Sequence, residues 1–447
     1  MGEINVVDAP AQVMASEKEM LFLSDHAVSK KGNDTIFGCY ARYLQAAESG
    51  ADAVNGTVGA LLTDSGRLAV NTIVIDEIRN ADEMEFASYA PLKGIPAFLD
   101  LSKSLALGES REQLESLGIH MTSIATPGGS GSLHIAAKCF ANPGEKVLLR
   151  DRHWGPYTGF LDGCGLKMET YPLLPSQDHD DFPFFDHLSF EQAVVKLANE
   201  QHHVMTWLND PAHNPTGLSL PSESRIELLN IFMRQAVNHS KVGFTLLIDS
   251  AYHFYAQETH GWANTIVEAL QSGMMWPENL VICFALSISK SHTIYGMRNG
   301  ALICLHPEEE IVSRLHDVFG VTGRQAWSAS PRVSQHALCN LHADAQKSLV
   351  WRESLDEFHA LLHERRDSFL QACQQYHVPI NPTHDGFFAW LETDRASEIV
   401  EACASKHVYL VPLDGGVRIG LCAIPTHHIE RVAKVISEAI FETKGSV

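Results

Sequence analysis

The chain has no long hydrophobic run and little positive charge. No segment approaches the roughly 18 apolar residues of a membrane-spanning helix, and the N-terminus lacks a basic region followed by an apolar stretch. Lysine and arginine number 33 against 54 acidic residues, which gives a formal net charge of −21. Because nucleic acids and anionic membranes would repel such a chain, neither is expected as a partner. We expect a soluble, cytoplasmic protein.

The chain also lacks the usual cysteine and histidine signatures of disulfide frameworks and metal sites. Its nine cysteines are scattered and contain no Cys-x-x-Cys pair, so we expect reduced core residues. Several of the 24 histidines are adjacent pairs, and an acidic run lies at 178–181, but adjacent residues point in different directions. His359 and His363 have helical ligand spacing without a third ligand. No metal site is expected.

The middle of the chain alternates between apolar patterns typical of helices and apolar runs typical of strands. A length of 447 residues exceeds what one core usually supports, so two domains are expected, although no repeat or low-complexity linker divides them. Strands are expected at 147–149, 203–208, 244–248, 280–286 and 301–305, with helices at 132–140 and 222–237. This alternation predicts an α/β fold with a mostly parallel, doubly wound sheet buried on both faces.

The C-terminal part follows another pattern. Residues 346–376 predict one long helix that leads to another unit. Short strands at 387–391, 408–411 and 417–421, with helices at 397–405 and 426–440, predict a compact α+β tail. The first 70 residues do not resemble a domain by themselves and are expected to join this tail. We therefore predict a large domain at 69–350 and a smaller discontinuous domain formed by 1–68 and 351–447.

A lysine in a hydroxyl-rich segment is the first candidate for chemistry. Residues 287–298 read SISKSHTIYGMR and follow the apolar run at 280–286, at the strand end where open α/β sheets bind ligands. Partial burial and the neighbouring Arg298 push Lys290 towards the neutral amine that forms Schiff bases. The serines and Arg298 suit a phosphate. By itself the segment favours an ordinary surface lysine, and only the other motifs of the chain change that interpretation.

A glycine-rich turn at 126–131 (TPGGSG) offers backbone N–H groups and a helix dipole to an anion. The third glycine of a dinucleotide fingerprint is missing, because His134 occupies that position, so a nicotinamide cofactor is disfavoured. Phosphate binding by this turn is still expected.

Two further segments end predicted strands with polar side chains. In 209–217 (NDPAHNPTG) the Asn214 amide can donate to a phenolate-type oxygen, although the turn also has a purely structural explanation. In 249–252 (DSAY) Asp249 is either a helix cap or the partner of a protonated ring nitrogen. Tyr252 can present its hydroxyl beside Asn214.

An arginine lies in the apolar segment 415–420 (GGVRIG) of the tail. A buried arginine needs an anion, so Arg418 pairs either with an internal carboxylate or with a substrate carboxylate held bidentately. Together the motifs provide for a phosphate, an aldehyde, a phenolate oxygen and a basic ring nitrogen. Pyridoxal 5′-phosphate carries all four groups.

In these motifs the chain resembles the fold-type I aminotransferases, specifically the aspartate and aromatic amino-acid branch of class I. The resemblance runs from about Asp34 to Ile440 and implies a seven-stranded-type large-domain sheet, pyridoxal phosphate and a homodimer. It implies Lys290 as the Schiff-base lysine, Asp249 as the ring-nitrogen partner, and Tyr252 with Asn214 on the ring oxygen. The implied phosphate ligands are Gly129, Ser130, Ser287, Ser289 and Arg298.

The resemblance also implies residues for the ring, the substrate and the dimer. Trp154, in 152–156 (RHWGP), resembles the aromatic residue that stacks on the cofactor ring. Tyr89, in 88–94 (SYAPLKG), resembles a tyrosine that reaches the neighbouring subunit's phosphate. Arg324, in 324–328 (RQAWS), matches an arginine supplied in trans for a distal carboxylate. Arg418 matches the arginine that binds the substrate α-carboxylate. Gly59 and Val58 match the loop that lies over this carboxylate.

Some positions depart from the family pattern. Leu61 and Leu62 replace a usual tyrosine and lysine, and Trp327 replaces a usual tyrosine beside Ser328. Tyr157 occupies the position where a histidine commonly supports the ring-nitrogen aspartate. Ile36 and Phe37 are expected at the entrance to the site. The apolar replacements near that entrance favour larger or aromatic substrates over strict aspartate specificity.

The resemblance implies a ping-pong aminotransferase that works through a Lys290 aldimine. It would move an amino group between an L-amino acid (aspartate, glutamate or aromatic) and a 2-oxo acid such as 2-oxoglutarate. One alternative is another reaction of the same cofactor, such as C–S lysis of a cysteine conjugate. Another is a non-catalytic pyridoxal-phosphate-binding regulator. The Arg324 position favours the aminotransferase, and the acidic charge disfavours a DNA-binding regulator.

Overall fold

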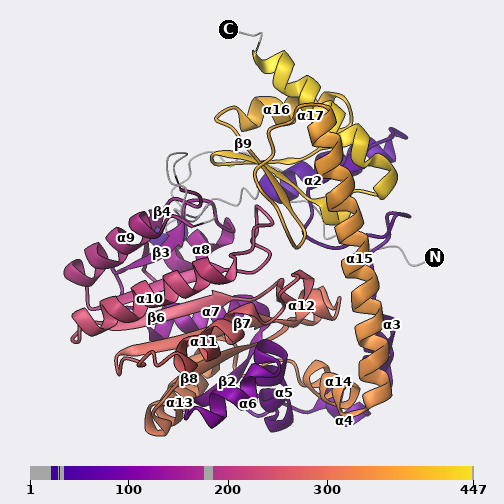
Figure 1. Ribbon diagram of the computed structural model, residues 1–447. Helices are drawn as coiled ribbons and strands as arrows, with labels where there is room; N and C mark the ends of the chain where they lie inside the picture. The colour runs from indigo at the N-terminus through magenta and orange to yellow at the C-terminus, as the bar shows by residue number, and fades with distance from the viewer. Residues whose placement is uncertain (1–21, 29, 31–34, 176–184, 445–447) are drawn as a thin grey trace.

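The structure is a computed structural model that describes residues 22–28, 30, 35–175 and 185–444. The acidic run at 178–181 and Asp34 lie outside the described residues. A larger and a smaller body are connected along one side of the molecule by the long helix α15 (Ala345–Gln375), which the sequence predicts within one residue at each end (Figure 1). The short helix α1 (Asp25–Val28) precedes both bodies.

A seven-stranded sheet forms the centre of the larger body (Figure 1). Its strands lie in the order β2 (His120–Pro127), β8 (Asn299–His306), β7 (Leu280–Ser287), β6 (Gly243–Asp249), β5 (His203–Asn209), β3 (Lys146–Arg150) and β4 (Lys167–Tyr171). Neighbouring strands from β7 to β4 are parallel, whereas β8 is antiparallel to both β2 and β7. The prediction of a mostly parallel α/β sheet is confirmed.

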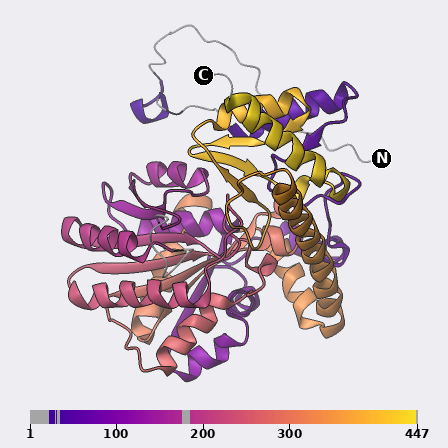
Figure 2. The ribbon, with the colours of Figure 1, turned by 45° about the horizontal axis from the view of Figure 1, so that its top comes forward.

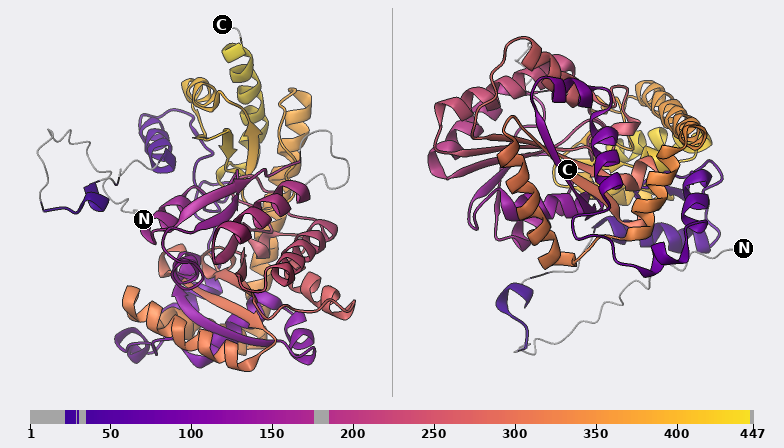
Figure 3. Two further views of the ribbon diagram at one scale, coloured as in Figure 1. Left: turned by 90° about the vertical axis from the view of Figure 1, so that its left-hand side faces the viewer. Right: turned by 90° about the horizontal axis from the view of Figure 1, so that it is seen from below.

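Helices cover both faces of this sheet, as the views in Figures 2 and 3 show. One face carries α7 (Gly128–Cys139), α8 (Pro156–Gly163) and α13 (Glu309–Trp327); the other carries α5 (Pro96–Leu107), α6 (Ser110–Ser116), α9 (His187–Glu200), α10 (Ser222–Asn238) and α11 (Gly261–Gln271). Alternate strand residues point to opposite faces, so Leu246 and Ile248 join one buried cluster and Leu247 joins the other. Double-sided burial explains why these strands are continuously apolar.

Three further helices pack together beside the larger body. They are α3 (Thr72–Arg79), α4 (Glu83–Ala87) and α14 (Arg332–Ala343). Both α3 and α14 also contact α15, so this group supports the long helix at the end away from the smaller body (Figure 1).

The smaller body combines both ends of the described chain (Figure 1). It contains α2 (Thr35–Glu48), β1 (Val54–Asn55), β9 (Ala389–Glu392), α16 (Ala396–Ser405), β10 (Val408–Tyr409), β11 (Val411–Leu413), β12 (Gly416–Ile419) and α17 (Ile429–Lys444). Strand β1 pairs in parallel with β10, and a separate buried cluster lies between the sheets and helices here. The domain boundaries after residues 68 and 350 stay a prediction, and helix α15 continues unbroken across the second one.

Some sequence predictions were wrong in detail. The strand expected at 408–411 is two strands, because β10 pairs with β1 whereas β11 pairs with β12. The helix expected at 426–440 begins as a 3₁₀ turn, and α17 starts at Ile429. Strands β2 and β4 were not predicted, because β2 is rich in hydroxyl residues and β4 is a largely exposed edge strand.

Among the described residues, no helix combines the length and the apolar character needed to cross a membrane. Nor does this part of the chain group three or more histidine, cysteine, aspartate or glutamate side chains in a way that could hold a metal ion.

Candidate active site

The ends of the central strands meet at one cavity of about 240 Å³. Parallel register places Asn209, the last residue of β5, beside Asp249, the last residue of β6, and the short helix α12 (Ile288–Ser291) follows directly on β7. The cavity is lined by Gly129, Ser130, Leu133, Trp154, Asn209, Asn214, Asp249, Ala251, Tyr252, Ser287, Ser289, Lys290 and Arg298. The structure thus brings together every predicted cofactor-binding residue except Tyr89.

Lys290 extends into this cavity from α12. Burial, with the positive charge of Arg298, lowers the pKa of Lys290 to about 8, against the opposing influence of Asp249. Its Nζ atom lies 5.5 Å from the ring centre of Tyr252 and 5.2 Å from that of Tyr295. About a tenth of the amine is therefore neutral at pH 7, far more than for an ordinary lysine, and the neutral form is the one that attacks an aldehyde.

One end of the cavity has the donors and the space for a phosphate. Helix α7 begins at Gly128, whose φ of 72° favours glycine and whose added Cβ would lie 2.5 Å from Nη2 of Arg298. Arg298 also donates to the Ser289 hydroxyl at 3.2 Å. At Gly129 a Cβ would come within 3.3 Å of Ser287. The unpaired N–H groups of the helix start, the hydroxyls and the guanidinium therefore fit an anion.

The carboxylate of Asp249 is held from two directions. Tyr157 donates its hydroxyl to Oδ2 at 2.6 Å, and the backbone N–H of Ala251 donates to Oδ1 at 3.1 Å. Burial raises the pKa of Asp249, while the hydrogen bonds and Lys290 act in the opposite direction. A buried carboxylate at the cavity wall suits a protonated ring nitrogen, whose charge would stabilise its ionised form.

Asn214 and Tyr252 lie together, as predicted, next to Arg418. The Asn214 side chain donates to the Tyr252 hydroxyl at 3.5 Å, and Arg418 donates to the Asn214 oxygen at 3.5 Å. The Asn214 backbone N–H donates to the side chain of Asn209, which fixes the turn. Burial raises the pKa of Tyr252, so its hydroxyl stays protonated and can donate to a ring oxygen.

Arg418 comes from strand β12 of the smaller body and is 2% exposed. Its guanidinium donates to the Thr57 carbonyl at 2.6 Å and lies 4.6 Å from the ring centre of Phe388. At Gly59 an added Cβ would lie 3.1 Å from Phe388 and 3.8 Å from the Tyr252 hydroxyl. Arg418 and Gly59 therefore lie beside the residues of the cavity wall, although neither lines the cavity itself.

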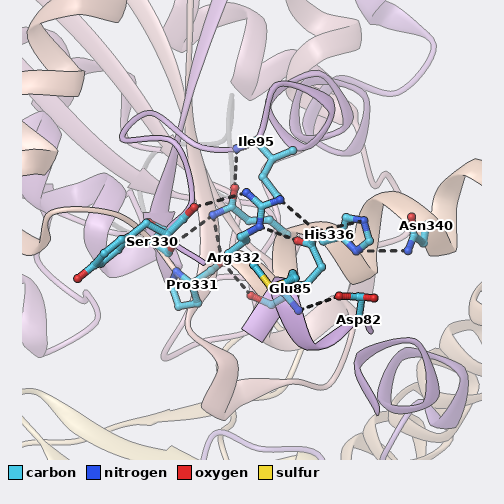
Figure 4. Close-up of polar contacts among 12 residues, drawn as sticks. Asp82, Glu85, Ile95, Ser330, Pro331, Arg332, His336 and Asn340 are labelled. Carbon is cyan, nitrogen blue, oxygen red and sulfur yellow. Dashed lines mark hydrogen bonds and ion pairs between the residues drawn. The ribbon is translucent and has the colours of Figure 1, made fainter. Parts of the chain in front are cut away.

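The structure leaves the two residues predicted to act across a dimer away from the cavity of their own chain. Tyr89 is 89% exposed, and Arg324 is exposed on α13. The chain that carries Tyr89 is nevertheless anchored, because Arg332 of α14 donates to both carboxylate oxygens of Glu85 at 2.7 and 3.0 Å (Figure 4). Arg332 also donates to the Tyr89 carbonyl at 3.4 Å. Phe37, expected at the entrance, is 69% exposed on α2.

Sequence reasoning missed four residues in or beside the cavity. Leu133 and Ala251 line it without a chemical signature of their own. Asn209 could have been found, because it ends its strand as Asp249 does and the two are register partners. Tyr295 lies within the lysine segment; its hydroxyl accepts a hydrogen bond from the Leu61 N–H at 3.2 Å. That contact joins residues far apart in sequence and has no local signal.

The chain is similar to known proteins over most of its length. The family described as aminotransferase class I and II matches residues 51–436. Curated relatives carry the names aromatic-amino-acid, aspartate or tyrosine aminotransferase. The aromatic-amino-acid aminotransferase of Pseudomonas aeruginosa is 24% identical over 421 residues, covering 92% of this chain and 98% of that protein.

Solved structures agree with this assignment. The aminotransferase of Anaerococcus prevotii superposes with a TM-score of 0.85 at 25% identity, covering 93% of this chain and 98% of that one. An aromatic-amino-acid aminotransferase of Burkholderia pseudomallei, covalently bound to pyridoxal phosphate, has a TM-score of 0.72 at 19% identity and shows the shared fold, with 92% and 98% coverage. The predicted fold type and family are confirmed: this chain belongs to the class I and II aminotransferases.

Proposed function

We propose that the protein uses pyridoxal 5′-phosphate to exchange an amino group between an L-amino acid and a 2-oxo acid. The amino donor would be aspartate, glutamate or an aromatic amino acid, the acceptor would be a 2-oxo acid such as 2-oxoglutarate, and the two half-reactions would follow each other in ping-pong order. One observation carries the proposal. A single cavity holds a lysine with a pKa lowered to about 8, a buried carboxylate and an anion cradle.

Each group of the cofactor has residues that suit it. Ser287, Ser289, Arg298 and the start of α7 would hold the phosphate, and Lys290 would hold the aldehyde carbon covalently between turnovers. Trp154 would stack on the ring. When bound, the cofactor supplies an electron sink for the substrate Cα.

The residues of the chain would then position the substrate and move its proton. Arg418 would bind the α-carboxylate bidentately beside Asn214, and the loop at Gly59 would cover it. Once released by the substrate, the Lys290 amine would take the proton from Cα and deliver it to the neighbouring cofactor carbon. Asp249 would keep the ring nitrogen protonated, and the Tyr252 hydroxyl would donate to the ring oxygen.

We further propose a homodimer in which Tyr89 and Arg324 act on the neighbouring subunit's site. Their exposure supports this, because neither lines the cavity of its own chain. Met84 and Phe86, close to Tyr89 in sequence, are 62% and 57% exposed, and exposed apolar groups of this kind mark contact surfaces. Tyr89 would reach the phosphate of the cofactor bound to the partner. Arg324 would bind the distal carboxylate of a substrate in the partner's site. We propose that this enzyme works in the cytoplasm.

A direct experiment separates the proposed reaction from its alternatives. Purified protein loaded with pyridoxal phosphate is given glutamate and, separately, a cysteine conjugate. Release of 2-oxoglutarate with conversion of the cofactor to its amine form supports transamination. Release of pyruvate and ammonia from the conjugate, without transamination, would identify a lyase. Cofactor binding without turnover of any donor from an aspartate, glutamate and aromatic panel would identify a regulator and overturn the proposal.

A further inference from the structure

The loop after β1 is held by two buried polar side chains that have no role in the proposed chemistry. Asn55 ends β1 and is 4% exposed, and Thr57 is fully buried. The Thr57 backbone N–H donates to Oδ1 of Asn55 at 3.0 Å, and the Thr57 hydroxyl donates to the same oxygen at 2.8 Å. Because a backbone N–H can only donate, the Asn55 atom that faces it must be the amide oxygen, which fixes the direction of both bonds.

Main-chain hydrogen bonds fix the loop as far as Gly56. The Gly56 N–H donates to the Tyr409 carbonyl of β10 at 2.8 Å, and the Gly56 carbonyl accepts from the Gly420 N–H at 2.9 Å. At Thr57 a side chain takes over, because the N–H and the hydroxyl of this residue both bind Asn55. Asn55 therefore determines how the Thr57 peptide group is oriented.

The Thr57 carbonyl in turn holds Arg418. It accepts from Nη2 of Arg418 at 2.6 Å, whereas the bond from Nη1 to the Asn214 oxygen is longer, at 3.5 Å. The Phe388 ring covers one face of the guanidinium, with its centre 4.6 Å from Cζ. A guanidinium that is held at one nitrogen and packed on one face has a fixed plane, and bidentate binding of a carboxylate depends on that plane.

Resting on the proposed function, we propose that Asn55 and Thr57 are positioning residues for substrate recognition: Asn55 orients the Thr57 peptide group, and the Thr57 carbonyl sets the plane in which Arg418 meets the α-carboxylate. Neither residue lines the cavity, so both act through Arg418. Because every amino donor carries an α-carboxylate, a weaker hold on Arg418 should weaken the binding of all donors alike.

The residues that suit the phosphate belong to other segments. They come from the start of α7, the end of β7 and α12 of the larger body, together with Arg298, whereas β1 belongs to the smaller body. A change in the loop after β1 should therefore alter substrate binding and leave cofactor binding unchanged.

The test compares wild-type protein with Thr57→Val, which keeps the branched shape and removes the hydroxyl. Both proteins are loaded with pyridoxal phosphate and mixed with excess glutamate or, separately, with a second donor from the aspartate and aromatic panel that the wild type converts. Absorbance follows the conversion of the cofactor to its amine form. The dependence of the rate on donor concentration gives an apparent dissociation constant and a limiting rate constant.

We expect the apparent dissociation constant for both donors to rise about fivefold in Thr57→Val, because one hydrogen bond that orients Arg418 through Thr57 is lost. The limiting rate constant should change by less than about twofold, because the groups that move the proton are untouched. The dissociation constant for pyridoxal phosphate should stay at the wild-type value.

Two single substitutions are the matched controls. Thr57→Ser keeps the hydroxyl and should bind both donors as the wild type does. Thr206→Val removes another buried threonine hydroxyl, which lies on β5 and donates to the Leu148 carbonyl at 3.0 Å, and should leave all three constants unchanged.

A double substitution tests whether the two residues act as one unit. Asn55→Ala removes the acceptor of both bonds and should raise the donor dissociation constants more than Thr57→Val does. Adding Thr57→Val to Asn55→Ala should change them little further, because the hydroxyl has then already lost its partner. Asn55→Ala also replaces Thr57→Val as the test if the latter does not fold.

Equal donor dissociation constants in wild type and Thr57→Val would overturn the inference, as would the same increase in Thr57→Ser. An increase for one donor only would contradict it, because the loop would then recognise the substrate side chain. An equal loss of affinity for pyridoxal phosphate would contradict it too, because the loop would then support the cofactor. Failure of the wild type to convert its bound cofactor with any donor is a different result and would instead remove the proposed function.

Discussion

The predicted site divides into a buried part and an exposed part. The buried part, which comprises Lys290, Asp249, Asn214 and Tyr252, lines one cavity and is held by hydrogen bonds and packing within the chain. The exposed part, Tyr89 and Arg324, lies on the surface of the same chain. In the proposed homodimer, one chain would supply the bond-making groups of a site, whereas Tyr89 and Arg324 of the second copy would contribute to cofactor retention and substrate choice. Substitutions in the two parts should therefore differ in the size of their effects and in the property, turnover or binding, that they alter.

The largest effect is expected in the buried part, from Lys290→Ala. Removing both the covalent anchor and the proton carrier should lower kcat by about 10⁴-fold or more, because general acid–base and nucleophilic contributions are lost together. Turnover of glutamate with a 2-oxo acid measures this. Lys434→Ala, at an exposed position of α17, is the matched control and should keep wild-type turnover. Near wild-type turnover of Lys290→Ala would show that another group carries the proton.

A second prediction concerns how burial of Lys290 affects stability. The pKa of Lys290 is about 8 in the folded protein, below its ordinary value of 10.5. Between these values the unfolded chain binds more protons than the folded one, so the stability of the cofactor-free protein rises with pH across this window. Relative to Lys290→Met, wild-type protein should gain about 3 kcal/mol between pH 8 and 10.5.

Urea denaturation of both cofactor-free proteins at several pH values measures this gain, because all other titrating groups are common to the two. If the free energy of unfolding changes with pH in the same way in wild type and Lys290→Met, then Lys290 is charged and solvated in the folded protein.

The same division explains what could be predicted from the sequence. Lys290, Asp249 and Asn214 each follow an apolar strand, and parallel strands bring their carboxyl ends to one edge, so their convergence follows from local pattern. The contact of Tyr295 with Leu61 joins positions 234 residues apart, which no local pattern encodes. Strand β4 was missed because an exposed edge strand has no continuous apolar run. The role of Arg324 at the site of a neighbouring chain stays a prediction, because it depends on a second copy.

In the exposed part, Arg324→Leu should alter substrate choice without altering the chemistry. We expect KM for aspartate and glutamate to rise about 10- to 100-fold, because a charge-assisted contact with the distal carboxylate is lost, while KM for phenylalanine changes little. Steady-state kinetics with the three donors measures this. Unchanged kinetics towards glutamate would remove the case for a dicarboxylate site.

Mixed dimers test whether Arg324 acts across the interface. In a Lys290→Ala chain paired with an Arg324→Leu chain, one of the two sites combines an intact lysine with the partner's intact arginine. Statistical pairing should therefore recover about a quarter of wild-type activity at low glutamate. If Arg324 serves its own chain, the mixture should show no such recovery.

The smallest effect is expected from Tyr89→Phe, which keeps the ring and removes one hydroxyl. Loss of a single hydrogen bond to the partner's phosphate should weaken pyridoxal phosphate binding by about 1 kcal/mol, or roughly fivefold, with little change in KM for any amino acid. Arg332 fixes the backbone at this position through Glu85 and the Tyr89 carbonyl, so the substitution should leave the surface and the dimer intact. Cofactor titration, with sedimentation to verify the dimer, measures the effect. If cofactor affinity stays at the wild-type value while the dimer persists, the phosphate is held by one chain alone, and the exposed part of the site contributes to substrate choice only.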